Sequence, residues 1–277
     1  MRRLKNLTAT FTVWTLSLLS LVPLVLILAS IISKGIRSIG WDFLTSLPKP
    51  PGEPGGGIAN AIVGTFMLIV IASAIAVPVG VMAGVYLSEA GESKLKGYVR
   101  LCADMLQGTP SIVVGILAYL WVVVPMHRFS ALSGGVALAL IMLPTIVRAT
   151  EESLLLVPQE LREASLALGA SRWRTVLKVV IPAGLPGVAT GVMVSVARIA
   201  GETAPLLFTA FGNPFMTVNP AEPVNALPLV IYNYASSPYR DWWEQAWGAS
   251  LVLIAMVLIL NIGARAFVKR VRGGGYE

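Results

Sequence analysis

The stretch IANAIVGTFMLIVIASAIAVPVGVMAGVYL, residues 58–87, contains 30 residues and no charged side chain. An α-helix needs about 20 predominantly apolar residues to cross the roughly 30 Å hydrocarbon layer of a bilayer. The stretch is therefore long enough to span a membrane, with a kink expected at Pro78 or with one end outside the bilayer. This stretch predicts that the chain is a helical membrane protein.

Further long uncharged runs follow the same pattern along the chain, and 56% of all residues are hydrophobic. Only 13% are charged, against about 25% in an ordinary soluble domain. Six buried helices of a soluble protein would need a larger polar shell than this composition supplies. We therefore predict an all-α integral membrane protein, a single domain over residues 1–277, with transmembrane helices at about 11–32, 58–87, 105–126, 130–147, 183–210 and 245–264.

The first run also has an alternative interpretation as a signal peptide, because the basic sequence MRRLK precedes it. The apolar region of a signal peptide usually has about 7–15 residues, and the run at 11–32 is longer. It also lacks a small-x-small cleavage site followed by a soluble domain. We therefore favour an uncleaved membrane anchor and keep the signal peptide as the alternative.

Lysine and arginine are distributed unevenly between the loops. If the N-terminus is cytoplasmic, the inner segments hold fifteen of these residues and the outer segments five, with Arg198 left inside the fifth span. This distribution follows the positive-inside rule, and it predicts both termini on the cytoplasmic side of the inner membrane of a prokaryote. The net charge of +7 then reflects topology and contact with anionic lipid, and no nucleic-acid partner is predicted.

Residue types that usually carry metal or covalent chemistry are scarce. Cys102 is the only cysteine and His127 the only histidine, so neither a disulfide nor a metal cluster is predicted. The P-loop motif G-x-x-x-x-G-K-[ST], which binds nucleotide phosphates, does not occur. We expect a chain that is not an enzyme and has no cofactor of its own, so any ATP and Mg would be bound by another chain.

The stretch VARIAGETA, residues 196–204, places Arg198 and Glu202 within the apolar fifth span. A charged residue near a helix centre costs about 2.5–3.5 kcal/mol on translocon scales and tends to mark a solute path. The spacing predicts that both side chains share one helix face and form a pair. A purely structural ion pair that locks this helix to a neighbour remains the alternative, although buried pairs are poor stabilisers.

Two polar interruptions separate the later spans. The outer one, about 211–244, contains LPLVIYNYA, which is too short to span and is predicted to be interfacial or re-entrant, facing an external partner. In the inner one, about 148–182, Gly169 is expected to separate two short helices. Trp173 and Leu177 share a face of the second helix, so this loop needs either a partner surface or the membrane surface to cover it.

The inner loop resembles the cytoplasmic EAA loop of ABC-importer permeases: E-A-A, three residues, G, nine residues, then I-x-L-P. The chain has EAS at 163–165, Gly169 and VVIP at 179–182 with the same spacing. In that family the loop is the coupling helix that docks on an ATP-binding subunit. The resemblance implies a type I importer permease fold, with coupling residues Glu163, Ala164, Gly169 and Pro182.

Other stretches narrow the resemblance to permeases of the phosphate-transport type: GTPSIVVGI at 108–116, LPTIVRATEESL at 143–154, ARIAGETAPLL at 197–207 and ALPLVIY at 226–232. The resemblance implies ATP-driven import of inorganic phosphate. It also implies four further subunits: a second, similar permease, two ATP-binding subunits and an external phosphate-binding protein.

A phosphate substrate would give Arg198 a role, because a guanidinium offers planar, bidentate donors to an oxyanion and keeps its charge. Glu202 would hold Arg198 in place, and Thr203, Thr109 and Ser111 would add hydroxyl donors. Two alternatives remain open from the residues alone. One is a permease of the same architecture for another solute, such as a different oxyanion; the other is an ion-coupled secondary transporter or channel.

Overall fold

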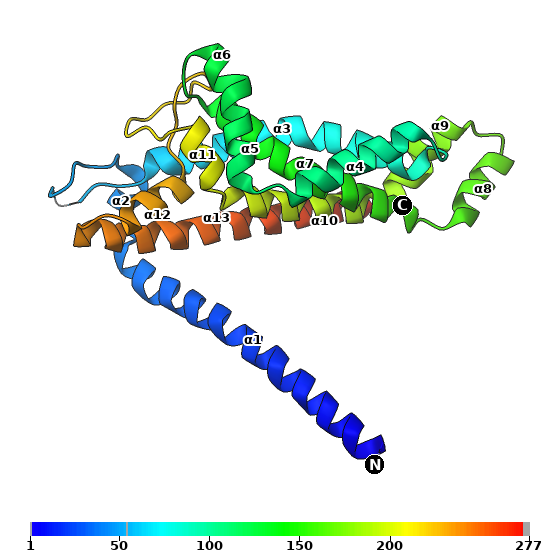
Figure 1. Ribbon diagram of the computed structural model, residues 1–277, viewed down its shortest axis with the longest axis horizontal. Helices are drawn as coiled ribbons and strands as arrows, with labels where there is room; N and C mark the ends of the chain where they lie inside the picture. The colour runs from blue at the N-terminus through cyan, green and yellow to red at the C-terminus, as the bar shows by residue number, and fades with distance from the viewer. Residues whose placement is uncertain (1, 54, 274–277) are drawn as a thin grey trace.

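The computed structural model describes residues 2–53 and 55–273, and these residues form an all-α fold (Figure 1). Among the described residues, the β-pairing is limited to an isolated bridge between Phe211 and Val224. Two π-helical turns, Tyr119–Val123 and Val176–Val180, join α5 to α6 and α9 to α10. The α-helices are α1 (Arg2–Ser38), α2 (Trp41–Thr45), α3 (Ala59–Glu89), α4 (Lys94–Gly108), α5 (Ser111–Ala118), α6 (Val124–Met126), α7 (Ala131–Leu155), α8 (Gln159–Ala167), α9 (Arg172–Thr175), α10 (Ile181–Ala200), α11 (Ala204–Thr209), α12 (Leu227–Ala235) and α13 (Arg240–Gly273).

Several helices in the described part of the chain are long and apolar enough to cross a membrane. Helices α3, α7, α10 and α13 run along the long axis of the molecule in Figure 1. A further candidate is a bent pair, in which α4 is followed by the Ser111–Met126 segment at an angle of 109°. The unbent candidates are Lys5–Ser38, Ala59–Glu89, Ala131–Leu155, Arg172–Ala200 and Arg240–Ala266.

The apolar run at 105–126 does not form the single helix that its length predicts. Helix α4 ends at Gly108, and the next helix begins at Ser111 after the sharp bend. Pro110 explains the break, because its ring removes an N–H donor and disfavours the helical conformation in the preceding residue. Thr109 is accordingly extended, with ψ 131°. The prediction of an uninterrupted span here is therefore wrong.

The run at 183–210 is also interrupted. Helix α10 ends at Ala200, and Gly201 follows as the C-cap, so the chain leaves the helix before Glu202. A new, short helix, α11, then begins at Ala204. The expected continuous helix through residue 210 is therefore wrong, because the glycine ends it in the middle of the apolar run.

Upstream of α10, the helix begins much earlier than expected. It runs without interruption from Arg172 through α9 and the π-helical turn Val176–Val180 to Ala200. Pro182 cannot donate a hydrogen bond to the turn before it, which is consistent with the wider π-helical turn at this point. Gly169 thus separates α8 from one long helix, and the expectation of two short helices is wrong for the second.

Helices α3, α7 and α10 form the core of the molecule and approach one another at glycines. A Cβ atom at Gly84 of α3 would lie 2.4 Å from Cβ of Thr150 on α7. A Cβ atom at Gly191 of α10 would lie 2.2 Å from Cβ of Ala149, also on α7. Small residues at helix interfaces allow this close approach in membrane proteins. The three helices therefore pack as one tight unit.

Helix α1 diverges from this unit (Figure 1). It contacts α13 only near its C-terminal end, where a Cβ atom at Gly35 would lie 2.7 Å from the carbonyl oxygen of Trp247. The apolar side chains of its first part are exposed within this chain. In a membrane, such a surface faces lipid or another subunit.

At the opposite end from α8, the segment between α11 and α12 is tied back to α3. The Thr65 hydroxyl accepts a hydrogen bond from the Leu227 backbone N–H at 2.8 Å. The Asn60 side chain donates to the Asn213 carbonyl at 2.6 Å. The short helix α12, which was predicted not to span, packs its apolar side against α3 and α13.

Candidate solute path and coupling surface

Arg198 and Glu202 lie on either side of the break after α10. The Arg198 Nε atom is 3.8 Å from Oε1 of Glu202, so the predicted ion pair is confirmed. The predicted shared helix face is wrong, because Glu202 lies beyond the end of α10. The Arg198 side chain is 44% exposed and that of Glu202 18% exposed. The two charged side chains therefore lie at the surface of this chain, within an otherwise apolar run of sequence.

The donors of Arg198 are not engaged by the rest of the described chain. Its distance to Glu202 exceeds that of a hydrogen bond, and within residues 2–53 and 55–273 the Arg198 guanidinium donates no hydrogen bond. A guanidinium has five N–H donors and is always charged. Arg198 is therefore positioned by one neighbouring carboxylate and retains donors that can bind an anion.

The other candidate hydroxyls lie at the two helix breaks. Thr203 immediately precedes α11, whereas Thr109 and Ser111 flank the bend between α4 and α5. Helix α11 packs on α5, where a Cβ atom at Gly115 would lie 2.6 Å from Cα of Pro205. Non-helical backbone at membrane depth is tolerated only where protein or a water-filled cavity covers it. The structure therefore brings together the short helices that follow both breaks.

The hydroxyls themselves form no hydrogen bond with the Arg198 guanidinium in the described structure. The Thr109 hydroxyl donates to the Met105 carbonyl at 2.7 Å, within its own helix. Among the described residues, no hydrogen bond joins Thr109, Ser111 or Thr203 to Arg198. The structure thus brings Arg198 and Glu202 into contact, and it places the three hydroxyls at the breaks without joining them to this pair.

The coupling loop lies at the far end of the long axis (Figure 1). Glu163 and Ala164 are exposed on α8, which has no buried side chain. Gly169 has φ +80°, a conformation that side chains with a Cβ atom rarely adopt. Pro182 is exposed near the start of α10. Gly169 therefore ends α8 with a left-handed backbone conformation and separates it from the next helix, as its position predicted.

Large apolar side chains around α8 are exposed as well. This group comprises Leu155, Leu156, Leu161, Leu166, Leu168, Trp173 and Leu177. An exposed apolar patch rimmed by polar residues usually marks an interaction site. The structure therefore exposes an apolar surface at this loop, and either a partner subunit or the membrane surface must cover it.

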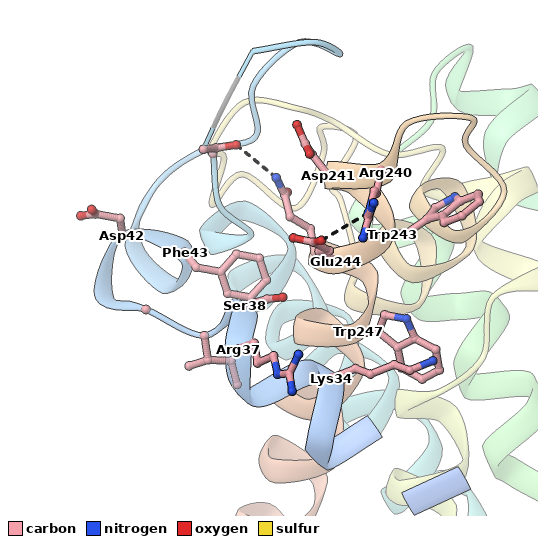
Figure 2. A pocket seen from close by; sticks show the side chains of 15 residues that line it. Lys34, Arg37, Ser38, Asp42, Phe43, Arg240, Asp241, Trp243, Glu244 and Trp247 are labelled. Carbon is pink, nitrogen blue, oxygen red and sulfur yellow. Dashed lines mark hydrogen bonds and ion pairs between the residues drawn. The ribbon is translucent and has the colours of Figure 1, made fainter. Parts of the chain in front are cut away.

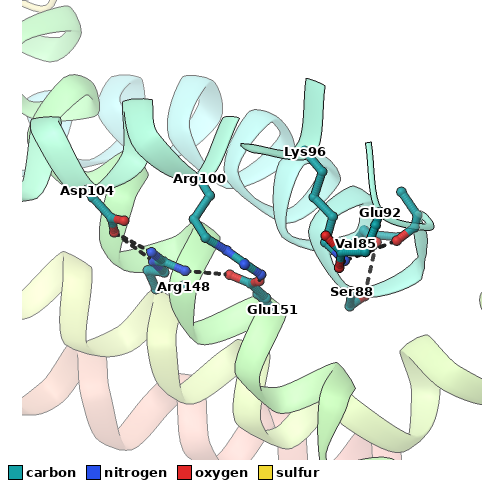
Figure 3. Close-up of polar contacts among 9 residues, drawn as sticks. Val85, Ser88, Glu92, Lys96, Arg100, Asp104, Arg148 and Glu151 are labelled. Atoms are coloured by element: carbon teal, nitrogen blue, oxygen red, sulfur yellow. Dashed lines mark hydrogen bonds and ion pairs between the residues drawn. The ribbon is translucent and has the colours of Figure 1, made fainter. Parts of the chain in front are cut away.

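A charged cluster between α4 and α7 was not predicted from the sequence (Figure 3). Glu151, with a side chain only 3% exposed, accepts hydrogen bonds from Arg100 and, at 2.8 Å, from Arg148. Arg148 also donates to Asp104. The spacing of Arg148 and Glu151 was the available signal, but both were assigned to the inner loop rather than to a span. The cluster fixes α4 against α7.

A cavity of about 730 Å³ lies between α1, α2 and α13 (Figure 2), at the end of the molecule opposite α8 (Figure 1). Its wall carries both charges and aromatics: Lys34 lies 4.5 Å from the ring centre of Trp247, and Arg240 pairs with Glu244 at 3.9 Å. None of the predicted site residues lines this cavity. It is therefore separate from the helix break that holds Arg198.

Comparison with known proteins identifies close relatives over nearly the whole chain. The phosphate transport system permease protein PstA of Yersinia pestis is 43% identical over 271 residues, which cover 97% of this chain and 92% of the relative. The PstA 1 protein of Mycobacterium tuberculosis strain H37Rv is 37% identical over 268 residues, covering 95% of this chain and 87% of the relative.

Solved structures show the same fold at lower identity. A bacterial ABC transporter that imports the acidic polysaccharide alginate, seen in complex with an alginate pentasaccharide-bound periplasmic protein, aligns with a TM-score of 0.69 and 13% identity, over 98% of each chain. The MetNI methionine ABC transporter in an inward-facing conformation aligns with a TM-score of 0.61 and 22% identity, over 78% of this chain and 94% of that chain.

A family model described as "binding-protein-dependent transport system inner membrane component" matches residues 76–273. This range contains α4 to α13, and with them the broken helices and the coupling loop. The model, the relatives and the fold agree with one another. The chain therefore belongs to the family of binding-protein-dependent transport system inner membrane components, and it is an integral inner-membrane permease subunit of the ABC-importer type.

Proposed function

We propose that this chain translocates inorganic phosphate as one permease subunit of an ATP-driven importer. The observation that carries the proposal is the accessible guanidinium of Arg198, beside Glu202, at a helix break within an apolar run. The relatives named above are phosphate transport system permease proteins at 37–43% identity, which supports the same solute. The chain itself makes and breaks no covalent bond.

Arg198 would bind phosphate oxygens through its planar donors, which suit an oxyanion better than a point charge does. Glu202 would keep the arginine in place and weaken anion binding in the empty path, so that phosphate is released rather than trapped. Thr203, Thr109 and Ser111 would supply hydroxyl donors after a rearrangement at the two breaks. Tight binding in one conformation and weak binding in the other is what alternating access requires.

The proposal places the chain in a complex with a second, PstC-like permease, two PstB-like ATP-binding subunits and a PstS-like phosphate-binding protein outside. ATP and Mg would be bound by the PstB-like subunits. Glu163, Ala164, Gly169 and Pro182 would form the coupling loop on which one of these subunits docks. The exposed apolar side chains around α8 support this assignment, because a docked subunit would cover them.

In this proposal residues 1–277 form a single permease domain with both termini in the cytoplasm. The described start of α1 and end of α13 both point toward the end of the molecule that carries α8, which supports the same side for all three (Figure 1). Met1 and residues 274–277, which include the termini themselves, lie outside the described residues. The distribution of lysine and arginine supports the same orientation.

The deciding experiment is solute uptake by the purified complex in proteoliposomes. Labelled phosphate, sulfate and molybdate are supplied with their binding proteins, with ATP or a non-hydrolysable analogue inside. We expect phosphate uptake that requires ATP hydrolysis and is at least tenfold faster than uptake of the other two anions. Preferential sulfate or molybdate uptake would instead indicate a permease for another oxyanion. Uptake driven by an ion gradient without ATP would contradict the proposal altogether.

A further inference from the structure

Helix α8 is held to the rest of the molecule by few contacts. None of its side chains is buried. A cavity of about 690 Å³ lies between the coupling loop and the ends of α3 and α7, with Glu89, Arg162 and Trp173 in its wall. Apolar packing therefore does not connect α8 to the spans at this point. Specific polar contacts must therefore connect α8 to the spans.

Arg162 makes this connection from the middle of α8. One of its terminal nitrogens pairs with the carboxylate of Glu89, the last residue of α3. The other donates to the carbonyl oxygen of Leu154, in the last turn of α7, at 2.7 Å. The Arg162 side chain is 14% exposed and that of Glu89 21% exposed. The planar guanidinium of Arg162 thus connects α8 to the ends of α3 and α7.

The two spans that Arg162 reaches are themselves tightly packed. Besides the close contact at Gly84, a Cβ atom at Gly80 of α3 would lie 2.8 Å from a methyl group of Ile146 on α7. Such an interface leaves no space for sliding, because interiors packed at this density transmit displacement rather than absorb it. A force applied to Glu89 and Leu154 therefore moves α3 and α7 together.

A second polar contact connects α8 to α9 rather than to α3 or α7. The Ser165 hydroxyl lies 2.9 Å from that of Thr175 on α9, at the start of the long helix that continues into α10. Gly169, with its left-handed backbone, lies between these two residues in the chain. The link to α10 is therefore a single hydrogen bond between two neutral hydroxyls, whereas the link through Arg162 includes an ion pair and reaches two other spans.

We propose that Arg162 is a positioning residue that transmits the movement of α8 to α3 and α7. This inference rests on the proposed function, because it assumes that an ATP-binding subunit docks on α8. Lysine at this position would keep the charge but could not hold a carboxylate and a carbonyl in one fixed plane. Loss of Arg162 should therefore uncouple ATP hydrolysis from transport without removing the docking surface.

The test compares Arg162→Met with the matched control Arg172→Met in the complete complex in proteoliposomes. Arg172 is an exposed arginine of the same loop, and no described residue forms an ion pair with it. The measured quantities are solute taken up per ATP hydrolysed and the amount of ATP-binding subunit retained. We expect at least a tenfold fall in the ratio for Arg162→Met, about threefold for Arg162→Lys, and less than twofold for Arg172→Met.

A ratio for Arg162→Met within twofold of the control, in a complete complex, would overturn the proposal. If Arg162→Met prevents assembly, Glu89→Gln decides the question, because it keeps the size and hydrogen-bonding oxygen of the side chain and removes its charge. A fall of at least threefold in the ratio for Glu89→Gln supports the proposal. A ratio within twofold of wild type contradicts it.

Failure of the proposed function is recognised separately, because the wild-type complex would then take up no phosphate. The ratio is then measured with whichever oxyanion is carried. A readout that needs no solute is the ATP-dependent change in thiol reactivity of a cysteine at the exposed Met82 of α3, in a Cys102→Ser background. The change should occur with the Arg172→Met control and be lost with Arg162→Met; its retention with Arg162→Met contradicts the inference.

Discussion

At the scale of single residues, the charges of this chain divide into two kinds. Arg100, Arg148 and Glu151 satisfy one another in a cluster between two helices, and Glu151 is almost fully buried. Such a cluster is costly to break, because removal of one partner leaves a buried charge unpaired. Arg198, in contrast, has a loose pair with Glu202 and unused donors. This difference assigns a structural role to the first group and supports the proposal that Arg198 binds the solute.

The Arg198 prediction follows from this difference. Arg198→Gln should abolish phosphate uptake without loss of assembled complex, and Arg198→Lys should recover only part, because an ammonium loses the bidentate geometry. Glu202→Gln should slow transport less severely. The measurement is phosphate uptake per assembled complex. A structural ion pair would behave differently: either single change would reduce the amount of complex, and Arg198→Leu with Glu202→Leu would restore both assembly and uptake.

Glu222 provides a pH prediction in the segment between α11 and α12. Its carboxylate accepts hydrogen bonds from Thr217 at 2.6 Å and from Asn219 at 3.0 Å, and these bonds lower its pKa from the ordinary 4.5. A lowered folded-state pKa means that the stabilisation is present above the unfolded-state value and is lost as the pH falls through the folded-state value.

We therefore expect residues 214–222 to keep their order at pH 5 and above and to loosen only below the ordinary carboxyl pKa. Amide hydrogen exchange of this segment across a pH series, corrected for intrinsic rates, measures the effect. In Glu222→Gln the pH step should disappear. An identical step in wild type and Glu222→Gln would show that another group is responsible.

At the scale of secondary-structure elements, the breaks between helices determine where the candidate functional residues lie. Pro110 divides one apolar run and Gly201 divides another, and the short helices after both breaks pack together. Each break frees backbone groups that a continuous helix would pair. Gly169 separates α8 from the long helix in the same way. The elements to which we assign a role in solute binding or coupling therefore begin or end next to a proline or a glycine.

The coupling loop gives the prediction at this scale. Gly169→Val should strain the left-handed turn by about 1–2 kcal/mol, and Glu163→Lys should reverse a charge on the exposed side of α8. Both changes should reduce retention of the ATP-binding subunit or the ATP-driven uptake by about tenfold, while the chain still inserts into the membrane. Co-purification and uptake measure these effects. If both variants retained the subunit and transported normally, the loop would not be a coupling element.

At the scale of the whole molecule, the chain is incomplete as a single subunit. The apolar surface of α1 has few contacts within the described chain, and the surface around α8 is exposed. The tight unit of α3, α7 and α10 is the exception, because its glycines bring the helices into direct contact. The architecture thus combines a rigid core with surfaces that membrane lipid and other subunits must cover.

Membrane topology is the prediction for the whole molecule. Residues 33–57 and 211–244 should be external, and residues 88–104 and 148–180 internal. In a Cys102→Ser background, single cysteines at the exposed positions Glu53 and Ser236 should react with an impermeant thiol reagent in intact cells. Cysteines at the exposed positions Gly91 and Ser171 should react only after lysis. The reverse pattern would invert the topology and remove the coupling-loop assignment.

The sequence by itself determined the class of this protein. Long uncharged runs are sufficient to predict membrane helices, because hydrocarbon excludes charges and requires each backbone group to be paired within the helix. The spacing from Glu163 to Pro182, which resembles the EAA loop of importer permeases, was sufficient to propose a coupling loop. The pairing of Arg198 with Glu202 also followed from sequence, since residues four apart remain close even when a turn replaces the helix between them.

Only the tertiary structure decided where the helices break and which distant side chains meet. A single proline or glycine changes the mean hydropathy of an apolar run very little. The runs at 105–126 and 183–210 were therefore expected to form continuous helices. The contacts of Glu151 with Arg100 and of Arg162 with Glu89 join segments 51 and 73 residues apart. No local pattern encodes such contacts, because they depend on how closely the glycines of α3, α7 and α10 allow the helices to pack.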